Sequence, residues 1–222
     1  MLEERVTFRV PESHEDFRIL AGWLSSASPA AALTSDVRER PGPESLRQAC
    51  EQGANIRLIM SGNGELVGTA SWKARGNPRS FEFSLMIAEP SLWDSGVGGR
   101  AALRLVDELF MTYDARRVFA LTAAYNRHAV PSLVRSGFTL EGVLRDYYFL
   151  DGEFHDATVW SMLRDEHRAL IANEKNVGMQ YQPLVPAEDK EKGRRHVARA
   201  LQNDSLIPRS WQPIRQPDRI GR

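Results

Sequence analysis

The chain of 222 residues contains little of what several classes of protein require. It has one cysteine, Cys50, so it can form no internal disulfide, and this composition fits a reducing compartment. No apolar run is long enough to cross a membrane, and the N-terminal residues lack the apolar centre of a signal peptide. We therefore expect a cytoplasmic protein that does not associate with membranes.

Metal ligands are equally sparse. The five histidines are scattered along the chain, with no H-E-x-x-H pattern and no paired cysteines. We expect no bound metal, and we interpret Cys50 as a structural thiol rather than a nucleophile.

The sequence does contain a glycine-rich segment, Trp93-Asp94-Ser95-Gly96-Val97-Gly98-Gly99-Arg100-Ala101, which lies between an expected strand and an expected helix. Glycine lets the main chain adopt positive φ and approach a ligand closely. The amides of the first helical turn have no partner inside the helix, and the helix dipole favours an anion there. The segment therefore predicts a phosphate site built from main-chain groups.

Two common phosphate loops do not fit this segment. A P-loop needs Lys-Ser or Lys-Thr after its glycines, and neither follows here. The dinucleotide fingerprint is matched by Gly96, Gly98 and Ala101, but a connection containing Pro90 separates these glycines from the preceding strand. The next strand, Arg117–Ala123, also ends without the acidic residue that this fold requires. Both alternatives are therefore disfavoured.

A third kind of phosphate loop is indicated by motifs at fixed spacing along the chain. They are Pro90-x-x-Trp93-x-x-Gly96-x-Gly98, Asn126-x-x-Ala129, Gly137-Phe138, Glu141-Gly142-Val143-Leu144-Arg145 and Asp151-Gly152. Together they resemble the GNAT N-acetyltransferases, most closely the branch that acetylates ribosomal-protein N-termini, polyamines and antibiotic amines. The resemblance covers about Val6 to Arg164 and implies an α/β GNAT fold with a mixed, mostly antiparallel central sheet flanked by helices on both faces.

Hydrophobic periodicity and turn residues predict elements in the same order. The expected strands are Arg5–Val10, Asn55–Met60, Glu65–Lys73, Phe81–Ile87, Arg117–Ala123, Thr139–Leu150 and Glu153–Leu163. The expected helices are one capped by Ser13 and running to Leu24, then Pro43–Gln52, Gly99–Tyr113 and His128–Arg135, and the segment Ser25–Pro43 is expected to be a loop with room for one helical turn. We expect an acyltransferase domain over residues 1–172 and a basic C-terminal extension over residues 173–222, with one helix at Ala187–Asn203 and an irregular end.

The resemblance implies acetyl-CoA as the cofactor and suggests how it is held. The expected contacts are Trp93, Asp94 and the amides of Ser95, Gly96, Val97, Gly98, Gly99 and Arg100 for the pyrophosphate, and main-chain groups of Met86, Ile87 and Ala88 for pantetheine. Asn126 occupies the position of a cofactor-binding asparagine, although it is also an ordinary helix cap. The position that often carries an acidic tyrosine is Leu133.

Candidate catalytic residues come from two expected strands. Strand alternation places Glu82 on one face with Ser84 and Met86. The resemblance implies that Glu82 occupies the place of the base in some histone acetyltransferases, and the alternative is a solvated glutamate. Ser84 and Tyr147 are further candidates, the latter on the strand that walls the acceptor side of this fold.

The sequence thus predicts an acetyl-CoA-dependent enzyme that acetylates a primary amine, of a small molecule or a protein N-terminus, by direct attack. Alternatives are a longer or carrier-protein-bound acyl donor, and a catalytically silent binding protein whose tail engages RNA or an acidic partner. From Lys190 to Arg222 there are nine basic residues and three acidic ones, a net charge of +6, so the rest of the chain carries −6. An extension that packs on the acidic body of its own or of a neighbouring subunit, as in a homodimer, accounts for the asymmetry as well as an acidic partner does, and nucleic acid is the less favoured partner.

Overall fold

A computed structural model describes residues 6–25, 28–34, 41–172 and 185–202. The chain divides into two compact units, residues 1–180 and 181–222. The elements of the first unit are β1 (Thr7–Arg9), α1 (His14–Trp23), α2 (Pro29–Thr34), α3 (Pro43–Glu51), β2 (Asn55–Met60), β3 (Leu66–Arg75), β4 (Asn77–Ile87), a 3₁₀ turn (Pro90–Leu92), α4 (Val97–Met111), β5 (Arg117–Ala123), α5 (Ala129–Arg135), β6 (Thr139–Leu150), β7 (Glu153–Leu163) and α6 (Arg164–Ala172). The described part of the second unit contains α7 (Ala187–Gln202).

Seven strands form one sheet in the order β1-β2-β3-β4-β5-β7-β6. Every neighbouring pair is antiparallel except β4 and β5, which run parallel. These two strands pair over three positions, from Ser80–Arg117 to Glu82–Phe119, and no pairing continues to their C-terminal ends. The split leaves main-chain groups of both strands facing a gap, and this gap positions the site.

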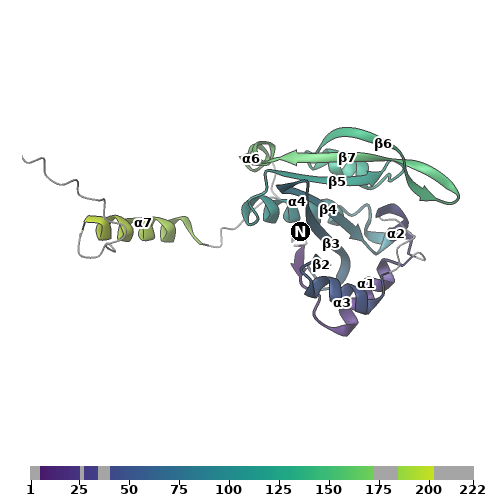
Figure 1. Cartoon of the computed structure of the whole chain (residues 1–222), viewed down its shortest axis with the longest axis horizontal. Coiled ribbons are helices and arrows are strands. Elements are labelled where there is room, and N and C mark those ends of the chain that lie inside the picture. The colour runs from purple at the N-terminus through teal and green to yellow at the C-terminus, as the bar shows by residue number, and fades with distance from the viewer. Residues whose placement is uncertain (1–5, 26–27, 35–40, 173–184, 203–222) are drawn as a thin grey trace, which may run out of the picture. The chain divides into compact units, whose positions relative to one another are not determined.

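Helices cover both faces of the sheet, as the sequence predicts (Figure 1). Because successive side chains of a strand point to opposite faces, Leu58 packs with α1 and α3 while the adjacent Ile59 joins the larger core under α4. The mixed, mostly antiparallel sheet with helices on both sides confirms the predicted fold class.

The start of α1 follows the predicted cap. Ser13 Oγ accepts a hydrogen bond from the amide of Asp16, whose carboxylate in turn accepts from the amide of Ser13. Arg9 on β1 donates to both carboxylate oxygens of the nearly buried Asp16, and these hydrogen bonds hold the pKa of Asp16 far below its usual range. The cap therefore also joins β1 to α1.

Several predicted boundaries were wrong. Strand β4 begins at Asn77 rather than Phe81, because its first residues extend the hairpin with β3. Helix α4 begins at Val97, two residues before the predicted start, since Gly96 takes the left-handed conformation (φ 80°) and the helix starts directly after it. A short helix, α2, lies within the segment that was predicted as a loop with room for one helical turn.

Helix α6 was not predicted as a helix. It is held by a buried pair, in which Nε2 of His167 lies 2.6 Å from Oδ1 of Asp107 on α4. The His167 ring stacks on Phe110, with ring centroids 4.6 Å apart. These partners lie about sixty residues before α6, so the local sequence pattern carries little sign of it. The predicted basic helix is present as α7, while residues 205–222 lie outside the described residues.

Candidate functional site

A cavity of about 610 Å³ lies where β4 and β5 separate. Its walls come from α2, the C-terminal halves of β4 and β5, the glycine-rich segment with the start of α4, and the β5–α5 connection with α5. This volume is in the range of pockets that bind small molecules and cofactors. The cavity therefore joins the first turn of α4 to the gap in the sheet.

The glycine-rich segment turns sharply before entering α4. The amide of Ser95 donates to the carbonyl of Leu92, that of Val97 to Ser95 Oγ, and that of Arg100 to the carbonyl of Gly96. The amides of Gly98 and Gly99 belong to the first turn, where the helix itself supplies no acceptor. Of the six amides predicted to hold a pyrophosphate, three are thus already engaged, and the glycine amides are the ones best placed for an anion.

Close packing explains one of the two glycines of α4. A Cβ on Gly99 would lie 3.1 Å from Ser132 Oγ on α5, and one on Gly98 would lie at an ordinary 3.5 Å from Ile87. Gly99 therefore lets α4 and α5 approach, while the Gly98 position opens on the cavity.

The end of β4 contributes to the cavity through Ile87. Its carbonyl accepts a hydrogen bond of 2.8 Å from the indole of Trp93, which also lines the cavity. The Met86 side chain is buried elsewhere, and the amide of Ala88 donates to the carbonyl of Val67. Of the three residues predicted to meet pantetheine, the structure brings only Ile87 to the cavity wall.

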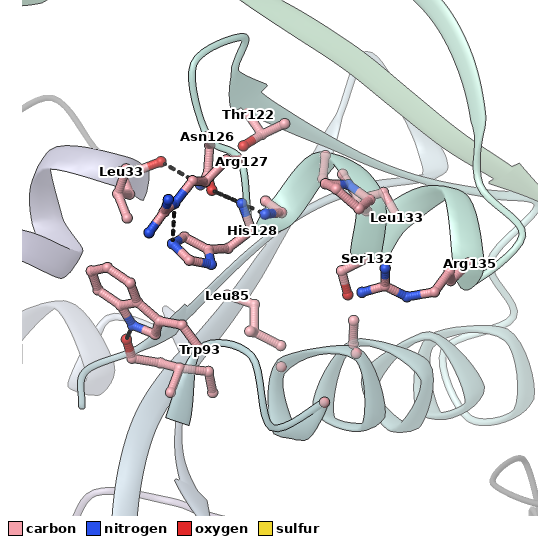
Figure 2. Close-up of a pocket in the computed structure, with 18 of the residues that line it drawn as sticks. Leu33, Leu85, Trp93, Thr122, Asn126, Arg127, His128, Ser132, Leu133 and Arg135 are labelled. Carbon is pink, nitrogen blue, oxygen red and sulfur yellow. Dashed lines mark hydrogen bonds between the residues drawn. The ribbon is translucent and has the colours of Figure 1, made fainter. Parts of the chain in front are cut away.

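Asn126 lines the cavity, and its side chain makes three hydrogen bonds. Its Oδ1 accepts from the amides of His128 (3.2 Å) and Ala129 (2.9 Å), and its Nδ2 donates to the carbonyl of Leu33 (3.0 Å). The residue is only 3% exposed. It therefore caps α5 and ties the β5–α5 connection to α2, as Figure 2 shows.

The neighbouring Tyr125 reinforces this tie. Its hydroxyl donates to the carbonyl of Ala32 at 2.8 Å, and its ring packs edge-on against His155. Burial raises the pKa of Tyr125, so the hydroxyl keeps its proton and its role as donor. Helix α2 is thereby fixed over one side of the cavity.

The predicted catalytic residues are not brought together. Ser84 lines the cavity, whereas Glu82 does not and forms ion pairs with Arg75 (2.7 Å) and Lys73 (3.9 Å) on β3. Tyr147 is 52% exposed on β6, packed edge-on against Tyr148. The assignment of Glu82, Ser84 and Tyr147 to catalysis stays a prediction.

Sequence reasoning missed a polar cluster at the mouth of the cavity. Nδ1 of His128 lies 2.9 Å from Oδ1 of Asp94, and its Nε2 accepts a hydrogen bond of 3.2 Å from Nε of Arg127. The His128 ring also packs on Trp93, with ring centroids 5.0 Å apart. No local pattern indicates this cluster, because Asp94 and His128 are 34 residues apart.

Helix α5 contributes an apolar side chain, that of Leu133, to the cavity wall. Leu133 lines the cavity and is 8% exposed, so no proton donor is present at the position that often carries a tyrosine. Ser132 and Arg135, also on α5, complete this end of the cavity (Figure 2).

Within the described residues, no group of three or more His, Cys, Asp or Glu side chains is arranged to hold a metal ion. No helix among them is long and apolar enough to cross a bilayer.

Comparisons with known proteins agree with this geometry. The model of the acetyltransferase (GNAT) family matches residues 13–138. No curated protein matches the sequence significantly. The structure is similar to that of spermidine N-acetyltransferase from Vibrio cholerae in complex with CoA and spermine, with 19% identity, a TM-score of 0.63, and coverage of 73% of this chain and 98% of that one. It is also similar to ribosomal-protein-S5-alanine acetyltransferase from Vibrio fischeri, with 18% identity, a TM-score of 0.61, and coverage of 74% and 96%. At these identities the likenesses show a shared fold.

Proposed function

Since the chain belongs to the acetyltransferase (GNAT) family, as its motifs predict, we propose that it transfers an acetyl group from acetyl-CoA to a primary amine by direct attack. The acceptor is an amine of a small molecule or a protein N-terminus. The neighbouring structures support this range, since one is named for spermidine and holds spermine, and another is named for the alanine of a ribosomal protein.

The observation that carries the proposal is the cavity at the split between β4 and β5, with the glycine-started helix α4 at one wall. Helix N-termini bind phosphate groups through free amides and the helix dipole. The unpaired edges of β4 and β5 offer hydrogen-bonding groups to the peptide-like pantetheine arm, as an added strand would use them. One cofactor, CoA, has both chemical features.

The residues of the cavity suit an attack without acid assistance. The amine nitrogen attacks the thioester carbonyl carbon, the C–N bond forms as the C–S bond breaks, and the CoA thiolate leaves. A thiol has a pKa of about 8.5, so its thiolate leaves without a protonating group near neutral pH. This agrees with an apolar Leu133 at the position where a donor could stand.

The proton of the amine needs an acceptor before or during attack. We propose that Ser84 makes a polar contact with the amine substrate, because it is the one of the three predicted catalytic residues that lines the cavity. Glu82 shares its strand face and could accept the proton only through water, in competition with Arg75 and Lys73.

The test is binding followed by turnover. Calorimetry with CoA measures the cofactor site, and release of free thiol from acetyl-CoA is then followed with spermidine, spermine and alanine-starting peptides. The proposal requires CoA binding and thiol release with at least one amine. Absence of CoA binding would refute the proposal. Turnover with longer acyl-CoA but not with acetyl-CoA would show that the acyl donor is a longer one.

We also propose that the C-terminal extension mediates self-association. Residues 187–199 of α7 are exposed, and the ion pairs of this helix, such as Lys192–Glu188 at 3.0 Å, are formed within the helix. Deleting residues 190–222 is expected to leave thiol release intact and to lower the molar mass measured by light scattering to that of a monomer. An unchanged mass would contradict this role.

A further inference from the structure

We infer that Asp94, His128 and Arg127 form a hydrogen-bonded chain that holds the Arg127 guanidinium in place for a phosphate group of the cofactor. The inference rests on the proposed function, because it assigns positioning residues to the same cavity. Arg127 would contact the phosphate, and Asp94 and His128 would act through Arg127.

The hydrogen bonds from Asp94 through His128 to Arg127 join the two loops at the mouth of the cavity. Asp94 lies two residues before Gly96 in the glycine-rich segment, and Arg127 and His128 lie in the β5–α5 connection. The His128 side chain is 15% exposed and packs on Trp93, whose indole is bonded to the carbonyl of Ile87. Figure 2 shows Trp93, Arg127 and His128 grouped at one end of the cavity. The imidazole is therefore held from several sides.

The contacts of His128 require a single neutral tautomer. Nε of Arg127 is a donor under all conditions, so Nε2 of His128 must be an acceptor without a proton. The proton of the neutral ring then lies on Nδ1 and points to the carboxylate of Asp94. Asp94 thus selects the tautomer that can receive Arg127, as a carboxylate orients histidines in many sites.

Electrostatics argues that Asp94 does not act by attraction. It is the only acidic residue among the described residues that line the cavity, and it lies beside a loop suited to anions. Its negative charge alone would weaken the binding of a phosphate. Arg127 and Arg135 are the cations of the wall, and among the described residues no carboxylate forms an ion pair with Arg127. The guanidinium therefore remains available for a ligand anion.

Asp94→Asn separates positioning from simple attraction. Removing a negative charge near a bound anion should tighten CoA binding if charge alone matters. If the chain holds Arg127, the amide can instead donate to Nδ1, which moves the ring proton to Nε2 and displaces Arg127. We expect CoA affinity to fall about fivefold in this variant and about tenfold in Arg127→Ala, which is about 1.4 kcal/mol for the latter.

Two substitutions of His128 test the ring itself. His128→Phe keeps a ring against Trp93 but removes both hydrogen bonds, and it should weaken CoA binding about as much as Asp94→Asn. His128→Gln keeps one donor and one acceptor and cannot gain a proton, so it should bind CoA within about threefold of the wild type.

The measurements are calorimetric titrations with CoA and with dephospho-CoA, and nitrogen NMR of the histidine tautomer in the free protein. The Nδ1–H tautomer is expected in the wild type and the Nε2–H tautomer in Asp94→Asn. A loss in Arg127→Ala that disappears with dephospho-CoA identifies the 3′-phosphate, and a loss that persists identifies the diphosphate. Wild-type affinity that no substitution changes, or tighter binding by Asp94→Asn, would overturn the inference. A wild type that binds no CoA would instead refute the proposed function.

Discussion

Two parts of the cavity wall are built in different ways. The wall at the start of α4 is made of main chain, with Gly96 in the left-handed conformation and the amides of Gly98 and Gly99 in the first turn, where the helix supplies no acceptor. The wall at the β5–α5 connection is made of side chains, because Tyr125, Asn126 and His128 all bond to residues far away in the sequence. The first part depends on the absence of a side chain at the glycines, and the second depends on hydrogen bonds to residues elsewhere in the sequence.

The strongest effect is expected at the main-chain wall. Gly98→Asp places a carboxylate in the first turn of α4, and the Cβ position has only an ordinary 3.5 Å contact with Ile87, so the fold should persist. Like charge at the phosphate site should lower CoA affinity more than about 100-fold by calorimetry. Gly98→Ala should bind within about threefold, and Gly22→Asp, which has no atom within 4 Å of its Cβ, serves as a control for added charge. Unchanged affinity in Gly98→Asp would place the phosphates elsewhere.

The side-chain wall should respond through stability instead. Asn126→Ala leaves two amides and one carbonyl without their buried partner, and it should lower the free energy of unfolding by about 2–3 kcal/mol in chemical denaturation. Equal stability of Asn126→Ala and the wild type would show that this wall is not held as described.

A substitution of Glu82 tests whether a β4 side chain that does not line the cavity affects the reaction. A general base contributes about 100-fold or more to kcat, whereas an ion pair on the strand surface does not enter the rate. Since Glu82 is bonded to Arg75 and does not line the cavity, we expect Glu82→Gln to lower kcat less than about threefold. A 100-fold loss, with KM unchanged, would instead establish the predicted base.

The smallest effect is expected at the ion pair between Arg117 and Glu141. The carboxylate of Glu141 on β6 accepts from Arg117 on β5 and from Ser161, and these contacts lower the pKa of Glu141 to about 2. A depressed pKa adds stability above the unfolded value of about 4.3 and loses it as pH falls towards 2. Glu141→Gln should therefore cost under about 1 kcal/mol at pH 7, because the pair is partly exposed. The difference from the wild type should vanish near pH 2 in thermal unfolding, and a constant difference would exclude the ionised pair as its cause.

The same contrast explains how much could be predicted from the sequence. Local rules indicated the glycine-rich turn and the helix after it, because glycine is the residue that tolerates the positive φ that such a turn requires, as Gly96 does at φ 80°. The near-continuous apolar pattern of β5 and the Asp151-Gly152 turn also predicted β5, β6 and β7 with the bounds that the structure shows. Where one segment determines its own conformation, the prediction succeeded.

The remainder depends on contacts between distant segments. Helix α2 is short, and the hydrogen bonds from Tyr125 and Asn126 to its carbonyls come from 93 residues away. The charge partner of His128 is similarly distant, and Glu82 is engaged by Arg75 across a hairpin whose length was underestimated. Such pairings are tertiary, so no periodicity in the sequence indicates them.

The three-position pairing between β4 and β5 has a consequence for the whole domain. The sheet consists of two half-sheets, β1–β4 and β5–β7–β6, joined edge to edge along a very short seam. A molecule that fills the open length of this seam acts as an eighth strand and couples the unfolding of the two halves. Occupancy should thus appear as slower amide exchange along both Leu85–Ile87 and Leu121–Ala123.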